Sequence, residues 1–260
     1  MSAEMNRVGR QTEIRKLIAS RGECSVGLLA GELGVSDMTV RRDLRALCED
    51  GRLIRTHGGA TLGERATFEF AFLDRVNKNR QAKTVIARAA AKLIGQSRSV
   101  MLDGSTTTLA VARQLRGMTN LTVITTSLPA AAELQHEPGV DVLLTGGYIR
   151  STSPDLTGSL AEANLGLLRA EIAFLGADAV DNQGNVFTDP PDNSAVLLEM
   201  IASARHVYVV ADHTKLGSTA LRCFGDLKQW AGLITDEACD KEFVNQLREQ
   251  GIDVIVAPFD

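Results

Sequence analysis

Apolar positions recur with two different spacings along the chain, and the change of spacing divides it in two. Near the N-terminus a helical spacing predicts three short helices, over residues 10–21, 26–33 and 37–50. Beyond residue 83, apolar runs of strand length alternate with helical patterns. Strands are predicted at 99–103, 121–125, 140–146, 171–177, 206–211, 231–236 and 253–257, and helices near 83–95, 106–116, 128–136, 193–204 and 240–250. Strands that are apolar almost throughout predict an α/β domain with a mostly parallel sheet covered by helices on both faces.

The third predicted helix has two faces of opposite character. At 100° per residue, one sector holds Val40, Leu44 and Leu47 and is expected to face a core. The opposite sector collects a methionine and three arginines, and polar residues stand at its N-terminal end. Ser25 and Ser36 are placed to cap the second and third helices, with Gly34 in the turn between them. A short helix, a glycine turn and an arginine-faced helix in this order predict a helix-turn-helix, whose recognition helix enters the major groove by its N-terminal end.

The segment "RLIRTHGGATL" (52–62) predicts a wing. Gly58 and Gly59 mark a tight turn between two extended arms, so we expect a two-stranded ribbon whose polar residues lie along the DNA backbone. The alternative is that an exposed arginine face merely interacts with solvent, but the ordered series of helix, turn and wing favours DNA. The predicted DNA contacts are Ser25, Ser36, Asp37, Met38, Thr39, Arg41, Arg42, Arg45, Arg52, Arg55, Thr56, His57 and Gly58.

Composition and charge narrow the class of protein. Hydrophobic residues make up 44% and charged residues 23% of the 260 residues, which is ordinary for a globular protein. Residues 1–62 hold ten Lys/Arg against eight Asp/Glu, whereas residues 63–260 hold 18 against 24, which hints at an anionic polymer as partner of the head. No apolar run approaches the length of a membrane span, and no secretory signal is visible. The four cysteines are scattered and lack metal-ligand spacing, so we expect a cytoplasmic protein with reduced, buried thiols, no metal, no cofactor and no membrane partner.

The predicted organisation is a DNA-binding domain over 8–62, a connector over 63–82 and an effector-binding domain over 83–260. The connector contains Phe68, Phe70 and Phe72, and free linkers rarely keep such residues exposed. We therefore expect it to dock on the larger domain and to carry a signal from there to the head.

Polar and glycine residues follow the predicted strands of the larger domain. In a parallel sheet the carboxyl ends of the strands form one edge, where ligands bind. Hydroxyl groups at a helix N-terminus, as in "DGSTTT" (103–108), suit an anion such as phosphate, Asp103 suits sugar hydroxyls, and Lys215 adds a cation. The predicted effector contacts are Asp103, Gly104, Ser105, Thr106, Thr107, Thr108, Thr126, Ser127, Gly146, Gly147, Gly176, Ala177, Asp178 and Lys215.

Three other interpretations stand beside this one. A single Ser/Thr-rich turn is equally well a capped helix start, although several such loops in succession favour a pocket. An aldose–ketose isomerase with a DNA-binding head would need a carboxylate base and a cation, for which Asp178, Asp181, Glu199 and Lys215 are available. A constitutive architectural DNA binder would need no effector loops at all.

Both parts of the chain resemble the DeoR family of bacterial transcription regulators. "VSDMTVRRDL" and "RTHGGA" (35–44 and 55–60) match the hallmark V-S-x-x-T-[IV]-R-R-D-L and R-x-H-G-G-A of its winged helix-turn-helix. "DGSTTT", "TTS", "TGG", "AFLGADAV" and "VVADHTKLG" are similar to motifs of its effector domain, which is related to ribose-5-phosphate isomerase. The family motifs D-S-G-T-T, T-N-S and A-D-S-S-K are matched with exchanges, and Lys215 falls on the lysine of the last.

The resemblance implies a regulator, most often a repressor of a sugar or polyol catabolic operon. Its partners would be palindromic operator DNA, a phosphorylated sugar-like effector and further copies of the chain in a homodimer or homotetramer. One departure is Leu197, where the family motif A-x-[VA]-K-x-x-M has lysine. The loss of a cation near a phosphate site leaves the class of effector open: it is a differently shaped phosphate, or an unphosphorylated polyol or sugar acid. The stretch "FTDPPDNS" (187–194) is expected to form part of an altered pocket rim.

Overall fold

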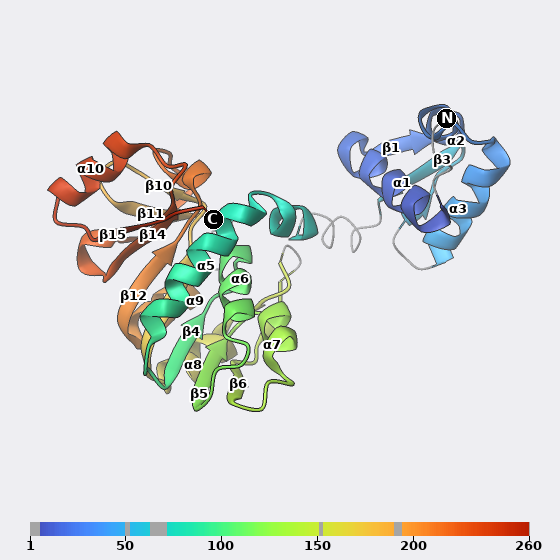
Figure 1. The fold of residues 1–260 in the computed structure, drawn as a ribbon. Coiled ribbons are helices and arrows are strands. Elements are labelled where there is room, and N and C mark those ends of the chain that lie inside the picture. The colour runs from blue at the N-terminus through green and yellow to red at the C-terminus, as the bar shows by residue number, and fades with distance from the viewer. Residues whose placement is uncertain (1–5, 50–52, 63–71, 151–152, 190–193, 260) are drawn as a thin grey trace. The chain divides into compact units, whose positions relative to one another are not determined.

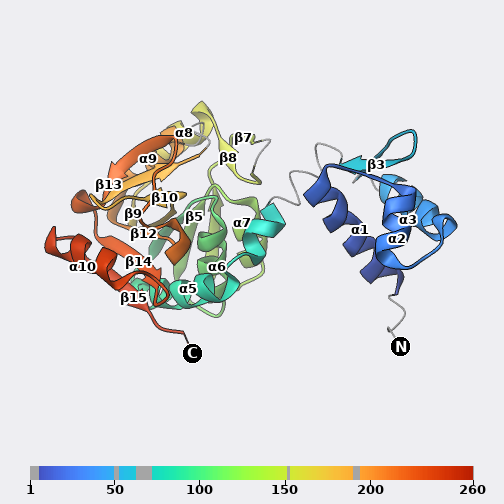
Figure 2. The same cartoon turned by 90° about the horizontal axis from the view of Figure 1, so that it is seen from above.

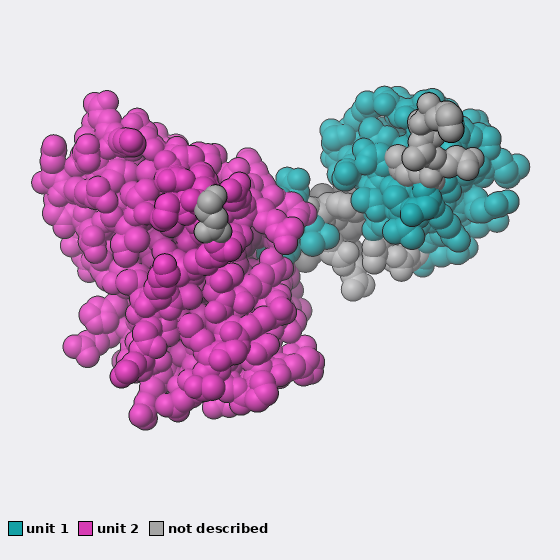
Figure 3. Space-filling view, in the orientation of Figure 1, with its two compact units in different colours: residues 1–75 teal, residues 76–260 magenta. Residues whose placement is uncertain are grey.

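The computed structural model describes residues 6–49, 53–62, 72–150, 153–189 and 194–259. The chain forms two compact units, residues 1–75 and 76–260, shown in different colours in Figure 3. The boundary between them falls inside the segment 63–82. Phe72 is buried, whereas Phe68 and Phe70 lie outside the described residues, so the docking of the connector stays a prediction.

The first unit is a winged helix-turn-helix (Figure 1). Its elements are α1 (Arg7–Arg21), β1 (Glu23–Ser25), α2 (Val26–Leu33), α3 (Asp37–Glu49), β2 (Leu53–Arg55) and β3 (Gly59–Leu62). The apolar faces predicted from the helical spacing meet in one core, where Ile14, Ile18, Val40, Leu44 and Leu47 are buried. Burial of these side chains is what holds three helices together that are too short to be stable alone.

Local signals start and stop these helices as predicted. The Ser25 hydroxyl accepts a hydrogen bond from the Leu28 amide, and the Ser36 hydroxyl accepts one from the Thr39 amide. Gly34 ends α2 in the left-handed conformation. The predicted wing of two strands is wrong in one respect: β1 joins it, giving a three-stranded sheet of order β1-β3-β2. The three-residue strand "ECS" is too short to show an apolar alternation, which is why the sequence concealed it.

The second unit is built on a seven-stranded parallel sheet, and the predicted α/β class is confirmed. The strand order is β15-β14-β12-β9-β4-β5-β6. The strands are β4 (Ser99–Leu102), β5 (Leu121–Thr125), β6 (Val140–Leu144), β9 (Ala170–Gly176), β12 (Ala204–Val210), β14 (Gly232–Asp236) and β15 (Val254–Ala257). Each of the seven predicted strands occurs, displaced by at most two residues at either end.

Helices cover both faces of the sheet (Figures 1 and 2). One layer consists of α5 (Arg80–Ile94), α6 (Thr106–Gln114) and α7 (Leu128–Leu134). The other holds α8 (Ser159–Gly166), α9 (Ser194–Ala202) and α10 (Lys241–Glu249). No helix among the described residues is long and apolar enough to cross a membrane.

Several small elements of this unit escaped prediction. They are α8, the hairpin β7 (Tyr148–Ile149) and β8 (Leu156–Thr157), and an antiparallel sheet of β10 (Ala179–Val180), β11 (Asn185–Thr188) and β13 (Arg222–Asp226). Two short 3-10 turns, His213–Lys215 and Leu227–Gln229, also follow strands. None of these strands has an unbroken apolar run of the length that marked the strands of the central sheet. The expectation of buried thiols was wrong for Cys223, which is exposed on β13.

Candidate nucleic-acid interface and effector pocket

The arginine face of α3 is exposed along its length. Arg41, Arg42 and Arg45 all have exposed side chains, whereas Val40, Leu44 and Leu47 on the other face are buried. Ser36, Asp37 and Met38 are exposed at the N-terminal end, and Thr39 is half-buried there. This leaves three guanidinium groups and a helix N-terminus facing outward, the arrangement that inserts into a major groove.

A buried carboxylate, missed in the sequence, fixes the orientation of this helix. Asp43 is 1% exposed, and its oxygens accept from Arg10 Nε (2.6 Å) and Gln11 Nε2 (3.3 Å) of α1. Arg7 Nε lies 3.7 Å from the same carboxylate. Asp43 falls on the same helical sector as Val40, Leu44 and Leu47, and this was the available signal. Its contacts tie α3 to α1, so the arginine face cannot rotate without breaking a buried ion pair.

The wing residues Arg55, His57 and Gly58 are exposed, and Thr56 is half-buried with its backbone amide bonded to the Gly59 carbonyl (3.2 Å). Gly59 has no room for a side chain, since a Cβ there would lie 2.0 Å from the Cys24 carbonyl oxygen of β1. The third strand thus explains the second glycine of the pair. Arg52 lies outside the described residues, and Ser25 is exposed at the start of α2.

In the second unit, the loops at the carboxyl ends of β4 and β9 meet. The Gly176 amide donates to Asp103 Oδ2 (2.8 Å), and a Cβ at Gly176 would collide with the Ser105 side chain at 2.4 Å. Ser105 caps α6 by accepting from the Thr108 amide (3.2 Å). The first amides of α6, which have no carbonyl partner within the helix, therefore lie beside the loop that follows β9.

The loops after β5 and β6 join this cluster. The Leu156 amide donates to the Thr126 carbonyl (2.8 Å), and Ser127 forms a β-bridge with Asp155. The Thr145 amide donates to the Thr125 carbonyl (3.2 Å), which brings the half-buried Gly146 and Gly147 to the same edge. The structure therefore places the predicted loops together, and it adds the β7–β8 hairpin to them.

The hairpin contributes an ion pair that the sequence did not reveal. Arg150 Nε and Nη2 donate to the two carboxylate oxygens of Asp155, each at 2.9 Å, and Asp155 is fully buried. This carboxylate lies against Gly104, where a Cβ would come within 2.3 Å of Asp155 Oδ2. Gly104 is thus needed for the close packing of a carboxylate rather than for a positive backbone angle.

Five of the polar residues predicted to contact an effector are buried, namely Asp103, Thr107, Thr108, Thr126 and Ser127. Asp103 accepts from the Ser105 amide (3.0 Å), the Thr108 hydroxyl (2.8 Å) and the Gly176 amide. These bonds tie β4, α6 and β9 together, and the contact of Asp103 with an effector stays a prediction.

Burial raises the pKa of the Asp103 carboxyl above its ordinary value, and the amides of Ser105 and Gly176 oppose that shift. Burial also raises the pKa of Asp155, against the effect of Arg150.

The accessible part of the cluster is a strip along β4, β9 and β12. Ser105, Thr106 and Ala177 are half-buried, Thr107 is buried, and Asp178 is exposed. Lys215 Nζ, in the turn after β12, lies 3.7 Å from Asp178 Oδ1. Asp178 also accepts from the Asp189 amide (2.9 Å). Hydroxyls, helix amides and one ammonium group therefore border the same strip, and this combination suits a small anion bearing hydroxyls.

Leu197 does not border this strip. It is 2% exposed in the apolar core beneath α9, among Val196, Met200 and Leu165. Leucine at this position fills the core, so the absence of a lysine changes the packing of α9 as well as the charge. Of the expected rim, residues 190–193 lie outside the described residues, and Phe187 and Thr188 belong to β11.

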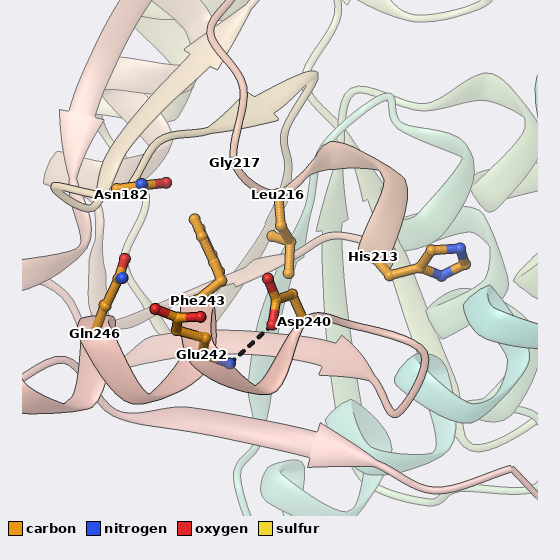
Figure 4. Close-up of a pocket in the computed structure, with 8 residues that line it drawn as sticks. All are labelled: Asn182, His213, Leu216, Gly217, Asp240, Glu242, Phe243 and Gln246. Carbon is orange, nitrogen blue, oxygen red and sulfur yellow. Dashed lines mark hydrogen bonds between the residues drawn. The ribbon is translucent and has the colours of Figure 1, made fainter.

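A pocket of about 210 Å³ is lined in part by His213, Leu216 and Gly217, close in sequence to Lys215 (Figure 4). Asp240, Glu242, Gln246, Asn182 and Phe243 line it, and the His213 ring points away from the two acids in Figure 4. Its volume is below the roughly 300 Å³ of a small-molecule site, and its carboxylates would repel an anion. None of the predicted effector residues lines it. We therefore place the candidate effector site at the strand ends and not here.

Comparison with known proteins adds family evidence to this geometry. Residues 10–66 match the DeoR-like helix-turn-helix domain, and residues 78–237 match the DeoR C-terminal sensor domain. The chain is 33% identical to the HTH-type transcriptional repressor CsqR of Escherichia coli (strain K12), over 95% of this chain and 94% of that protein. It is 29% identical to the glycerol-3-phosphate regulon repressor of the same strain, over 89% of this chain and 92% of that one.

Among solved structures, ribose 5-phosphate isomerase A from Methanocaldococcus jannaschii aligns with a TM-score of 0.40 and 19% identity. The alignment covers 53% of this chain and 55% of the isomerase.

Proposed function

We propose that this chain, which belongs to the DeoR family of DNA-binding transcriptional regulators, is a repressor whose affinity for DNA is set by a small phosphorylated metabolite. The observation that carries the DNA half of the proposal is the exposed arginine face of α3, held in place by Asp43 on its opposite side. The observation that carries the effector half is the strip at the strand ends bordered by Thr106, Asp178 and Lys215.

In the proposed complex, Arg41, Arg42 and Arg45 contact base edges or phosphates in the major groove. Ser36, Asp37, Met38 and Thr39 face the groove at the N-terminal end of the helix, with Ser25 beside the backbone. The wing, with Arg55, Thr56, His57 and Gly58, and with Arg52 ahead of it, follows the adjacent phosphates. Backbone contacts give affinity that weakens with salt, whereas the contacts to bases select the operator.

The test of the DNA half begins with selection of bound fragments from genomic DNA, followed by titration of the recovered operator. Arg42→Ala is expected to weaken operator binding by about 1–3 kcal/mol, roughly five- to a hundredfold, if it contacts a base. Arg21→Ala is the matched control, because Arg21 is an exposed arginine of the same unit that pairs with Glu32 away from α3. Wild-type affinity in Arg42→Ala removes this residue from the interface.

The proposed effector is a sugar phosphate or a closely related phosphorylated polyol. The phosphate would bind the first amides and hydroxyls of α6 from Ser105 to Thr107, and Lys215 would neutralise part of its charge. Ala177 borders the strip with only a methyl group, and Gly146 and Gly147, which follow β6 at the same edge of the sheet, have no side chains to block access. The name of the glycerol-3-phosphate regulon repressor supports a phosphorylated ligand.

A thermal-shift screen of the full chain tests the effector half. Glycerol 3-phosphate, ribose 5-phosphate and fructose 6-phosphate are compared with the same compounds lacking phosphate, and each is then added to the complex with operator DNA. A compound that raises the melting temperature and changes operator affinity supports the proposal. Stabilisation by the unphosphorylated compounds alone would replace the phosphorylated class with polyols or sugar acids.

The Asp178–Lys215 pair also has the groups that an aldose–ketose isomerase requires, a carboxylate beside an ammonium group. Because the related proteins are regulators, we expect no turnover of pentose or hexose phosphates. Turnover that disappears in Asp178→Asn would establish an enzyme instead.

We propose further that two copies of the chain pair through the edge strand β6, because winged helices read palindromic operators as symmetric pairs. β6 ends the sheet and exposes Leu143 and Leu144, and Tyr148 and Ile149 of β7 are exposed beside it. This edge strand has neither lysine nor proline, and its one charged residue is the exposed Asp141, so it is suited to pairing with its own copy across a two-fold axis. Leu144→Lys is expected to shift the mass measured by light scattering toward the monomer; an unchanged mass would exclude this edge.

Since the proposed partner is operator DNA, we place the protein in the cytoplasm.

A further inference from the structure

The turn that carries Lys215 also holds the first residues of the second unit. Asn79 precedes α5 and lies three residues after the boundary between the two units. Its Nδ2 donates to Asp212 Oδ1 (2.9 Å) and to Thr214 Oγ1 (3.1 Å), more than 130 residues away in sequence. The segment leading from the DNA-binding unit is therefore fastened to the loop after β12.

Asn79 has an unusual backbone conformation, and its side chain bonds to a distant loop rather than to its own helix. Asn79 has φ 51° and ψ 36°, a left-handed conformation that only glycine and, less readily, asparagine and aspartate adopt. It occupies the cap position of α5 but makes no capping bond to the helix. The side chain that usually closes a helix start is used instead to bind Asp212 and Thr214. Lys83 Nζ, donating to the Lys78 carbonyl (2.8 Å), fastens the preceding residue as well.

The other end of the same turn lies at the candidate effector strip. Asp212 accepts from the Thr214 amide (3.1 Å), and the Lys215 amide donates to the Asp212 carbonyl (2.9 Å). His213 is fixed to the buried Asp236 by its amide and by Nδ1, each at 2.8 Å. With His213 fixed, a movement of the Lys215 backbone is passed to Asp212 and Thr214, because the Lys215 amide is bonded to the Asp212 carbonyl.

We propose that Asn79 is the positioning residue that couples the Lys215–Asp178 pair to the segment leading to the DNA-binding unit. An anion at the strand ends competes with Asp178 for Lys215. The turn then shifts Thr214 and Asp212, and the two hydrogen bonds of Asn79 are strained or released. This inference rests on the proposed effector strip, but the coupling itself is a property of the free protein and is tested without a ligand.

The measurement is amide hydrogen exchange of the full chain at the first turn of α5. The Lys83 amide, which donates to the Asn79 carbonyl (3.0 Å), reports whether that turn is closed. Asn79→Ala is expected to raise its exchange rate at least about tenfold, the effect of losing a hydrogen bond to a charged group. Asn79→Gly, which keeps the backbone angle available, is expected to do the same. Asn120→Ala is the matched control, since Asn120 is the other non-glycine residue with positive φ (60°) among the described residues.

The decisive comparison is a double-mutant cycle. Lys215→Met is expected to raise exchange at Lys83 in the wild-type background and to add nothing in Asn79→Ala or Asn79→Gly. A merely structural role for Asn79 predicts equal effects of Lys215→Met in both backgrounds. That result, or no effect of Lys215→Met at all, overturns the proposal.

Ligand addition separates the two hypotheses. If ribose 5-phosphate, glycerol 3-phosphate and fructose 6-phosphate all leave the melting temperature unchanged while the cycle shows coupling, the phosphorylated effector fails and the coupling stands. If one of them alters operator affinity equally in wild type and Asn79→Gly, the effector stands and the coupling role of Asn79 is overturned.

Discussion

Replacing Gly104 with alanine is expected to damage the candidate effector site through a contact that is visible only in three dimensions. The new Cβ would lie 2.3 Å from Asp155 Oδ2, 2.5 Å from its Cβ and 2.6 Å from its Cγ. These distances are about 1 Å shorter than ordinary van der Waals contact, so Asp155 must move away. It cannot do so freely, because Arg150 holds both of its oxygens at 2.9 Å and the residue is fully buried.

The size of the effect follows from these constraints. Inserting a methyl group into a packed site costs about 1–3 kcal/mol, and loss of one partner from a buried ion pair costs about 3–5 kcal/mol. We therefore expect Gly104→Ala to lower the free energy of unfolding of the second unit by about 2–4 kcal/mol, between a pure clash and a fully broken pair. For a domain of this size, that corresponds to a fall in melting temperature of roughly 4–16 °C.

Urea denaturation of the full chain measures this change in the second unit alone. Trp230, which stacks on Phe224 with 5.9 Å between ring centroids, is the only tryptophan of the chain, so its fluorescence follows the unfolding of that unit. The matched control is Gly166→Ala on α8, whose Cβ would meet only Glu199 Oε2 at 3.6 Å. It is expected to be neutral or slightly stabilising, because alanine favours the helix. Equal stability of the two variants would refute the placement of Asp155 against Gly104.

Three further results are expected. Thr106→Val combined with Thr107→Val should leave operator binding intact and abolish the response to the effector; a double variant that still responds would move the phosphate away from α6. Asp43→Ala removes the carboxylate partner of Arg10, whose side chain is 16% exposed. Thermal melting of the first unit, followed by circular dichroism, should show that its free energy of unfolding falls by about 3–5 kcal/mol. A loss below about 1 kcal/mol would show that Arg10 finds another partner. Because burial raises the pKa of Asp103, the folded state holds this proton at pH values where the unfolded chain has already released it. The protonated carboxyl therefore contributes stability at acidic pH. That contribution is lost as pH rises from the ordinary pKa of about 4 through the raised value. Asp103→Asn, which cannot ionise, should therefore approach wild-type stability as pH rises across that window, and a constant difference at every pH would show that the shift is absent.

The elements that could be predicted from the sequence are those with a regular spacing of apolar residues or an unbroken apolar run. Val40, Leu44 and Leu47 share a helical sector, and the runs that became β4, β5 and β9 are apolar because both faces of the sheet are covered. The caps at Ser25 and Ser36 could also be predicted, because each involves a hydrogen bond to an amide only three residues away.

What the sequence did not reveal depends on partners far along the chain. The bond that Asp103 accepts from the Gly176 amide, 73 residues later, could not be predicted from the residues around Asp103. The Arg150–Asp155 pair belongs to a hairpin of two-residue strands, and no period marks such short strands. The sequence analysis did not single out Asn79, because its bonds to Asp212 and Thr214 join positions more than 130 residues apart.

The attachment of α3 through Asp43 separates support from recognition within a single helix. Asp43 points inward and holds the helix to α1, whereas Arg41, Arg42 and Arg45 face outward, and no hydrogen bond or ion pair joins them to another described residue. Exchanging Met38, Arg41 or Arg45 for other side chains should therefore redirect the protein to a new operator sequence at little expense in folding.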